Sequence, residues 1–256
     1  MFGGRDLLAL PSNDLRRVRG RQIGMVFQDP STSVNPVLTI GRQITEGLRE
    51  HFQMTSAARR ARAVELLDLV GIPDGKMRLD HYPHEFSGGQ RQRILIAMAV
   101  ACEPSLLIAD EPTTALDATV QAQIVELLKD LQNRLGMAIL WITHDLALVA
   151  GLVDRVAVMY AGSIVEQAPV RDLFKHPRHP YTLGLLKAMP LTDARHAKSQ
   201  SLISIPGSPP DLSEETNGCA FAPRCSQVID RCRAERPFLR SVGAAHEAAC
   251  LRSEER

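Results

Sequence analysis

The strongest constraint on the fold is a short apolar run that ends in two acidic residues. The run covers residues 105–109, and Asp110 and Glu111 follow it directly. A strand that is apolar at successive positions is typical of a parallel sheet whose two faces are both covered by helices. The run therefore predicts a buried strand of an α/β fold, with a pair of carboxylates at its carboxyl end.

The flanking segments support this layered arrangement. Downstream, one face of a predicted helix carries Val120, Ile124, Leu127, Leu128, Leu131 and Leu135, and Gly136 follows as a C-cap candidate. The pattern also predicts strands over residues 21–28 and 138–142, helices over about 39–70 and 87–101, and a hairpin of strands 155–160 and 163–166. This alternation predicts a parallel sheet with helices on both faces.

The net charge and the hydropathy of the chain argue against nucleic-acid binding and against a membrane-spanning segment. The 256 residues carry a formal net charge of +1, which provides no field to hold nucleic acid. No segment approaches the roughly 18 consecutive apolar residues needed to cross a bilayer. The N-terminal segment also lacks the apolar centre of a secretory signal. Any action at a membrane is therefore expected to proceed through another subunit.

Asp110 and Glu111 fit the chemistry of phosphoryl transfer. One carboxylate at a strand end can hold the Mg²⁺ of a Mg–nucleotide complex through water, and its neighbour can polarise the water that attacks the γ-phosphate. Two acids after an apolar strand are also common as solvated strand ends. The pair by itself is therefore a weak signal.

A second candidate phosphate site lies at the start of the helix predicted from residue 87. Ser87, Gly88, Gly89 and Gln90 place a hydroxyl and two glycines where free backbone N–H groups and the helix dipole favour phosphate. Ser87 is also a good N-cap in any helix. Alone, this motif does not separate a phosphate site from an ordinary helix start.

Taken together and in order, these motifs resemble those of ABC-type ATPases. The signature-like residues 87–90 are followed by the Walker B acids, by Ala115-Leu116-Asp117, and by a strand ending in Thr143-His144-Asp145. The resemblance implies an α/β, P-loop-NTPase-like ABC ATPase core that binds ATP and Mg²⁺. It also implies a head-to-tail dimer, in which each ATP lies between the Walker motifs of one subunit and the signature motif of the other.

By that resemblance each site residue has a role. Asp110 holds Mg²⁺, Glu111 polarises the attacking water, and Gln28, at a strand end, contacts both the Mg²⁺ and that water. His144 contacts the γ-phosphate, which completes the catalytic set Glu111, His144 and Gln28. The remaining nucleotide-binding residues act across the dimer interface: Asp117, Ser87, Gly88, Gly89 and Gln90.

The resemblance also implies a phosphate-binding Walker A loop, G-x-x-x-x-G-K-[ST], upstream of the strand that ends at Gln28. The only Gly-Lys pair in the 256 residues is Gly75-Lys76, which Met77 follows, so it does not match the motif. We therefore expect this chain on its own to bind ATP feebly and to be inactive. Either its gene starts upstream of the Met1 codon or the product is a true fragment, and the opening segment, which resembles an interior segment of the family, favours the upstream start.

The second half of the chain narrows the branch of the family. Residues 1–170 are predicted to be the ABC ATPase domain without its Walker A portion, 29–86 its helical subdomain, and 171–256 a C-terminal extension. Residues 162–166, 179–182 and 205–207 resemble the dipeptide and oligopeptide importer ATPases. The resemblance implies peptide uptake, with nickel and glutathione importers as alternatives.

The same resemblance implies partners and a location. The expected partners are a second ABC ATPase subunit, two integral membrane permease subunits and, indirectly, an extracytoplasmic substrate-binding protein. Gln28 and the segment after it are expected to contact the permease. The implied location is the cytoplasmic face of the inner (plasma) membrane, as a peripheral protein, with no nucleic acid involved.

Four of the five cysteines gather near the end of the chain: Cys219, Cys225, Cys232 and Cys250. Their spacing, C-x5-C-x6-C-x17-C, lacks the C-x2-C knuckles of zinc ribbons. Without an export signal, metal or cluster ligation is favoured over disulfides. Members of the importer branch that carry a [4Fe–4S] cluster make a cluster the leading expectation. Zinc and no metal remain alternatives, His246 is a candidate substitute ligand, and Cys102 is expected to be a buried apolar residue within the helix that follows the signature motif.

Two other functions share part of this pattern. A soluble ABC ATPase of DNA repair or translation has the same core motifs, but it lacks the His-Pro-Tyr-Thr tail and usually has two cassettes or a coiled-coil insertion. A non-catalytic cassette supplies only its signature motif to a partner. The intact Glu111 and His144 argue against that second alternative, whereas the missing Walker A loop is compatible with it.

Overall fold

The computed structural model describes residues 1–114, 116–189, 204–211, 213 and 217–253. The chain forms two compact units, Met1–His144 and Asp145–Arg256. Among the described helices, none has the length and apolar character needed to span a membrane.

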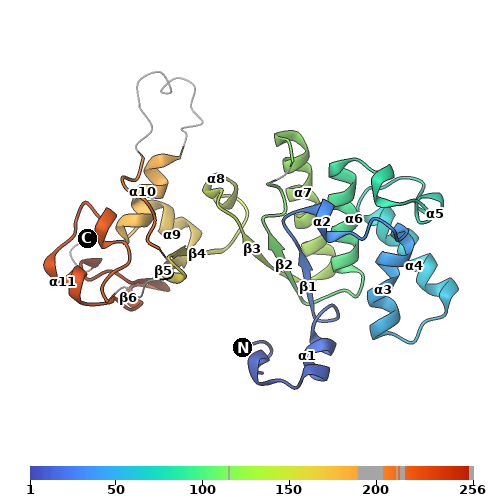
Figure 1. Ribbon diagram of the computed structural model, residues 1–256, viewed down its shortest axis with the longest axis horizontal. Coiled ribbons are helices and arrows are strands. Elements are labelled where there is room, and N and C mark those ends of the chain that lie inside the picture. The colour runs from blue at the N-terminus through green and yellow to red at the C-terminus, as the bar shows by residue number, and fades with distance from the viewer. Residues whose placement is uncertain (115, 190–203, 212, 214–216, 254–256) are drawn as a thin grey trace. The chain divides into compact units, whose positions relative to one another are not determined.

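The first unit is built on a three-stranded parallel sheet (Figure 1). Its strands are β1 (Ile23–Val26), β2 (Leu106–Asp110) and β3 (Ala138–Ile142), in the order β1-β2-β3. Gly24 pairs with Leu107, which pairs with Ile139. The predicted parallel α/β layer is confirmed. All three strands run in one direction, so their carboxyl ends meet at one edge of the sheet.

Two long helices cover one face of this sheet. They are α6 (Gly88–Val100) and α7 (Ala118–Leu135). Gly136 caps α7 with a φ of 64°, in the left-handed region that glycine adopts readily, as its position predicted. Leu107 and the buried face of α7 belong to one apolar core, in which Ile124, Leu128 and Leu131 are fully buried.

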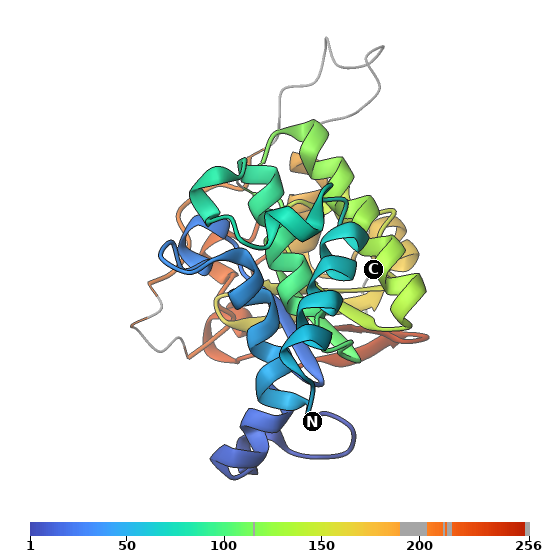
Figure 2. The same ribbon diagram turned by 90° about the vertical axis from the view of Figure 1, so that its right-hand side faces the viewer.

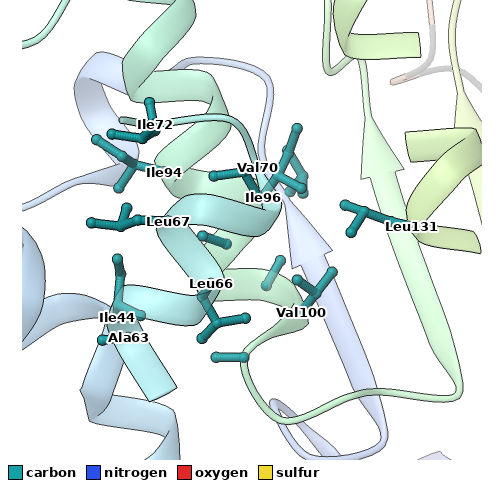
Figure 3. Packing of buried hydrophobic residues seen from close by; sticks show 14 of the residues in the cluster. Ile44, Ala63, Leu66, Leu67, Val70, Ile72, Ile94, Ile96, Val100 and Leu131 are labelled. Atoms are coloured by element: carbon teal, nitrogen blue, oxygen red, sulfur yellow. The ribbon is translucent and has the colours of Figure 1, made fainter. Parts of the chain in front are cut away.

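The helix expected over residues 39–70 is two helices, α3 (Ile40–His51) and α4 (Ser56–Leu69). The break has a local cause: the chain turns extended at Phe52, and the Thr55 side chain then caps α4 by accepting from the N–H of Ala58. Both helices pack against α6 through buried aliphatic side chains, as Figure 3 shows for Ile44, Leu66, Leu67, Ile94 and Ile96. The remaining elements of this unit are short: η1 (Leu7–Ala9), α1 (Ser12–Val18), α2 (Pro30–Ser33), α5 (Gly75–Arg78) and η2 (Pro83–Glu85).

In the first unit, the described helices lie on one face of the sheet rather than on both. Seen from the helical side, they stand in front of β1 (Figure 2). On the opposite face, Met25, Leu140 and Ile142 are 37%, 51% and 44% exposed. The apolar run therefore predicted correctly that β2 is buried on the face that the helices cover. The described helices of this unit do not cover the second face of the sheet.

The second unit contains a four-stranded antiparallel sheet in the order β4-β5-β7-β6. The strands are β4 (Arg155–Tyr160), β5 (Ser163–Pro169), β6 (Arg240–Gly243) and β7 (His246–Ala248). Ala161 and Gly162, with φ of 48° and 74°, form the predicted hairpin turn between β4 and β5. The helices of this unit are α8 (Leu146–Val149), α9 (Val170–Lys175), α10 (Pro180–Ala188), η3 (Ala222–Arg224) and α11 (Asp230–Ala234).

The hairpin of the second unit packs with the end of the chain. β5 pairs with β7, and Phe221 shares a small apolar core with Val158, Tyr160 and Leu173. The boundary between the two compact units lies between residues 144 and 145. The assignment of residues 145–170 to the ATPase domain stays a prediction.

Glu166 ties three segments of the second unit together, although it is fully buried. Its Oε1 accepts from His246 Nε2 at 2.7 Å and from the backbone N–H of Arg178 at 2.6 Å. Its Oε2 accepts from the backbone N–H of His179 at 2.9 Å. This carboxylate therefore holds the chain in place just before α10 begins at Pro180.

Candidate hydrolytic site

Three predicted catalytic residues meet at the carboxyl edge of the parallel sheet. Gln28 follows β1, Glu111 follows β2, and His144 follows β3. Gln28 Nε2 donates to Glu111 Oε2 at 2.7 Å, and His144 Nδ1 lies 3.1 Å from Glu111 Oε1. The strand order places these side chains together although they are distant in sequence. Ligand sites of open α/β sheets occur at this edge.

The backbone of Glu111 is fixed in an unusual conformation. Its φ is 44°, in the left-handed region that a non-glycine residue seldom adopts. Its N–H donates to the carbonyl of Ile142 at 2.9 Å, which attaches it to the end of β3. Strained residues of this kind are found at functional sites, where the surroundings hold them in place.

The Glu111 carboxylate is held in its charged form. The hydrogen bond from His144, and then the one from Thr114 Oγ1 at 2.9 Å, lower the pKa of Glu111 below its usual value. The side chain is 24% exposed, so water can reach it. An ionised, water-accessible carboxylate that is contacted by Gln28, Thr114 and His144 is suited to orient a water molecule.

Thr114 was not identified from the sequence. Its hydroxyl donates to the same oxygen, Oε2, that Gln28 contacts. The only sequence signal was a hydroxyl residue three positions after a strand-end carboxylate, a spacing that is common in turns. Ala115, the next residue, lies outside the described residues.

The residues present fit Mg²⁺ in donor chemistry. Asp110 and Glu111 offer carboxylate oxygens, and Gln28 offers an amide oxygen, which are hard ligands of the kind Mg²⁺ prefers. Among the described residues, no group of three or more His, Cys, Asp or Glu side chains is gathered closely enough to enclose a metal ion. Mg²⁺ bound by Asp110 would therefore take most of its ligands from phosphate and water, which is its usual behaviour at nucleotide sites.

The signature-like residues form the N-terminus of α6. Ser87 is the N-cap: its Oγ accepts from the N–H of Gln90 at 3.3 Å, and its own N–H donates to Gln90 Oε1 at 3.0 Å. A Cβ on Gly88 would meet nothing within 4 Å, so this backbone is open to approach by a ligand. A Cβ on Gly89 would lie 2.9 Å from Val120 Cγ1, so glycine lets α6 and the start of α7 come close together.

Asp117 has a clear structural task in the described chain. It is the N-cap of α7, and its Oδ1 accepts from the backbone N–H groups of Thr119 at 3.1 Å and Val120 at 3.0 Å. Because Gly89 also contacts Val120, the two helix starts lie side by side. The role of Asp117 across a dimer interface stays a prediction.

The four late cysteines line one small cavity in the second unit. The cavity has a volume of about 20 Å³, and its lining includes Cys219, Cys225, Cys232 and Cys250. The N–H of Cys219 donates to the carbonyl of Cys232 at 2.8 Å. Burial raises the pKa of the Cys219 thiol, and the nearby Cys232 and Cys250 raise it further. Residues 219–250 thus bring four thiols to the lining of one cavity, without gathering three or more of them closely enough to enclose a metal ion.

Two further expectations, about His246 and about Cys102 of the first unit, have clear outcomes. His246 is engaged by the buried Glu166 and does not line the cysteine cavity, so its candidacy as a substitute ligand was wrong. Cys102 is 8% exposed, and burial raises its pKa, which confirms it as a buried apolar residue. It lies just after α6, which ends at Val100, rather than inside that helix.

The chain is similar to known proteins along nearly its whole length. The model of the ABC transporter family matches residues 2–114, and that of the oligopeptide/dipeptide transporter C-terminal region matches residues 165–232. A protein of Brucella melitensis biotype 1, named as a peptide import ATP-binding protein, is 54% identical over 98% of this chain and 75% of its own length. The oligopeptide transport ATP-binding protein OppD of Bacillus subtilis is 52% identical over 96% of this chain and 68% of its own length.

A solved structure shows the same likeness in three dimensions. The ATP-binding cassette MJ0796, determined as a dimer in a post-hydrolysis state bound to ADP and Pi, is 31% identical with a TM-score of 0.56. The similarity covers 64% of this chain and 69% of that one.

Proposed function

The chain belongs to the ATP-binding proteins of ABC-type peptide importers, and from this membership we propose that it hydrolyses ATP to drive uptake of di- and oligopeptides across the cytoplasmic membrane. The chain is an ABC-type ATPase. The observation that carries the proposal is the Glu111 carboxylate, which joins the polar ends of all three parallel strands. The intact network favours a catalytic cassette over one that only serves a partner.

Glu111 acts as the general base. Gln28 and Thr114 both donate to Oε2, whereas Oε1 is contacted by His144. The His144 side chain is 70% exposed, so it has room to turn from Glu111 toward a γ-phosphate. That turn leaves Oε1 to accept the proton of the attacking water while Oε2 keeps the carboxylate in place. Mg²⁺, when bound with ATP at Asp110, neutralises charge on the phosphates.

The residues at the start of α6 serve the ATP of a second subunit. The open backbone at Gly88 and the N-terminal end of this helix favour a phosphate group. The dimeric state of the ADP-bound cassette MJ0796 supports a head-to-tail dimer. Asp117, at the adjacent start of α7, then faces the same interface.

The remaining partners follow from the importer family. Two permease subunits carry the peptide through the membrane, and a binding protein delivers it from outside. The ATPase sits on the cytoplasmic face of the membrane, where Gln28 and the segment after it contact a permease. Through this contact, movement of the permease is transmitted to Gln28, whose side chain donates a hydrogen bond to Glu111.

The cargo is tested by uptake in cells that differ only in this gene. We expect cells with the gene to accumulate labelled di- and oligopeptides at a higher rate than cells without it, because the relatives are named for peptide import. Unchanged peptide uptake together with lost nickel or glutathione uptake would assign the alternative cargo.

We also propose that the cysteine cavity holds a [4Fe–4S] cluster with a structural role. The proposal is supported by four thiols that line one cavity and are of the ligand type that such clusters use, although they are not gathered closely enough in the described structure to enclose a metal ion. The cavity of about 20 Å³ has room for little more than one water molecule, so cluster binding requires the four segments to move apart. The second unit buries a small core, so a metal centre would add folding energy there.

Iron analysis of anaerobically purified protein tests the cluster. We expect about four irons per chain and a broad visible absorbance, as Cys₄ ligation of a [4Fe–4S] centre implies. Cys225→Ser should remove both and make the second unit more sensitive to protease. Cys102→Ser, the matched control in the first unit, should change neither. Stoichiometric zinc would identify a zinc site instead, and metal-free protein with a protease-resistant second unit would refute both.

A further inference from the structure

One glutamine of α3 organises the loop that leads from the hydrolytic site to this helix. Gln43 is 5% exposed, which is unusual for a polar side chain. Its Oε1 accepts from the backbone N–H of Asn35 at 2.8 Å. Its Nε2 donates to the carbonyls of Asn35 at 3.0 Å and Leu38 at 2.9 Å. A single amide therefore satisfies three backbone groups of residues 35–38, a segment that we call the α3 loop.

The α3 loop is also shaped from within. Asn35 Oδ1 accepts from the N–H of Val37 at 3.1 Å, and the N–H of Leu38 donates to the carbonyl of Asn35 at 3.3 Å. This is a compact Asx-type turn. At its tip the Val37 side chain is 75% exposed. The loop thus presents an apolar tip to the outside while Gln43 holds its base.

The first turn of α3 is attached on its other side to the approach to the signature motif. The N–H of Ile40 donates to the carbonyl of His81 at 2.9 Å, and that of Gly41 donates to the carbonyl of Leu79 at 2.7 Å. A Cβ on Gly41 would lie 2.9 Å from that same Leu79 oxygen, so the close approach requires glycine. Residues 79–81 lead through η2 to Ser87, the N-cap of α6.

We propose that Gln43 is a positioning residue that holds the α3 loop on α3, so that permease movement against Val37 reaches the signature motif through the first turn of this helix. The proposal rests on the permease contact of the proposed function and adds the path by which that contact acts. Gln43 meets neither ATP nor peptide. Its effect is on how strongly peptide transport and ATP hydrolysis are coupled.

The alternative is that Gln43 only stabilises the fold. A stabilising residue affects ATP hydrolysis in the resting and the peptide-stimulated importer alike, because both need folded subunits. A positioning residue on the coupling path affects the stimulated rate alone. The ratio of the two rates therefore separates these roles.

The test uses the complete importer in proteoliposomes, with and without peptide-loaded binding protein. Gln43→Leu removes all three hydrogen bonds, and Gln43→Glu removes the two donated by Nε2. We expect the basal rate of ATP hydrolysis to stay within about twofold of the wild-type rate. The stimulation by peptide should fall by about 2- to 30-fold, the range of coupling changes that single residues produce. Gln132→Leu, the same replacement at a half-buried position of α7, should leave the stimulation unchanged.

Asn35→Ala tests the same loop without altering α3. It removes the Asx turn, so it should also reduce the stimulation, and hydrogen exchange at the Asn35 amide should rise in Gln43→Leu because its acceptor is gone. Full stimulation in both loop variants, or an equal fall of basal and stimulated rates, would overturn the proposal. A wild-type importer that shows no stimulation by peptide would instead contradict the proposed function itself.

Discussion

Replacing Glu111 with glutamine in an assembled importer whose ATPase subunits carry a Walker A loop is expected to lower the rate of ATP hydrolysis by about 10²- to 10⁴-fold, the usual contribution of a general base. Glutamine keeps the size of the side chain and one acceptor oxygen, so the bond from Gln28 or from Thr114 can persist. An amide cannot accept the proton of the attacking water. Hydrolysis should therefore stop while ATP remains bound.

The measurement is phosphate release under single-turnover conditions, together with the amount of ATP retained by the protein. Glu126→Gln, the same replacement at an exposed position of α7, is the matched control and should hydrolyse ATP at the wild-type rate. We expect Glu111→Gln to trap ATP-bound dimers, because the proposed head-to-tail dimer places each ATP between two subunits. A Glu111→Gln importer that hydrolyses ATP normally would show that another group is the base.

Replacing Glu166 with glutamine is expected to destabilise the second unit by about 2 to 4 kcal/mol. The native carboxylate accepts three hydrogen bonds inside the protein, from His246 and from the N–H groups of Arg178 and His179. Glutamine replaces one oxygen by an NH₂ group, which then faces at least one backbone N–H that can only donate. A buried polar group left without a partner costs about 1 to 3 kcal/mol, and here at least one native donor and the new amide both lose theirs.

Hydrogen exchange locates this effect. The amides of Arg178 and His179 should exchange faster in Glu166→Gln, and the unfolding transition of the second unit should move to lower temperature. Trp141, the single tryptophan, lies in β3 of the first unit, so its fluorescence should show little change. Glu235→Gln, which weakens only the exposed pairs with Arg231 and Arg240, should cost less than about 0.5 kcal/mol. Equal stability of Glu166→Gln and Glu235→Gln would refute the role given to Glu166.

The elements with a strong local pattern could be predicted from the sequence. The apolar run before Asp110 is β2, and the helical spacing of apolar residues before Gly136 is α7. The helix break near Phe52 was missed, because residues 48–70 contain neither glycine nor proline to mark it. Thr55 caps the second helix, but a threonine in such a run is an ambiguous signal.

The hydrolytic site was predictable in its residue types and not in its geometry. Gln28, Glu111 and His144 were identified as strand-end residues, but their contacts depend on the order β1-β2-β3. That order comes from packing over long separations in sequence. The left-handed conformation of Glu111 and the bond from Thr114 also depend on how β2 ends beside β3.

The second unit shows the same limit more strongly. β5 and β7 are separated by residues 170–245, and no local pattern states that Glu166 and His246 meet. The clustering of cysteines predicted a metal or cluster site; the four thiols line one cavity without forming a metal-binding group, so the cluster stays a prediction. Glu166 is buried and is hydrogen-bonded to His246. This burial was not predicted, because a glutamate in a hairpin strand usually faces solvent.

The most direct test of peptide-driven ATP hydrolysis is the rate of phosphate release by the complete importer in proteoliposomes, measured with and without peptide-loaded binding protein. We predict that peptide-loaded binding protein raises the rate in the wild type and in Glu126→Gln, and that Glu111→Gln shows almost no release in either condition. A wild-type rate that does not respond to peptide, or that responds to nickel or glutathione in its place, would contradict the assignment of this chain to peptide import.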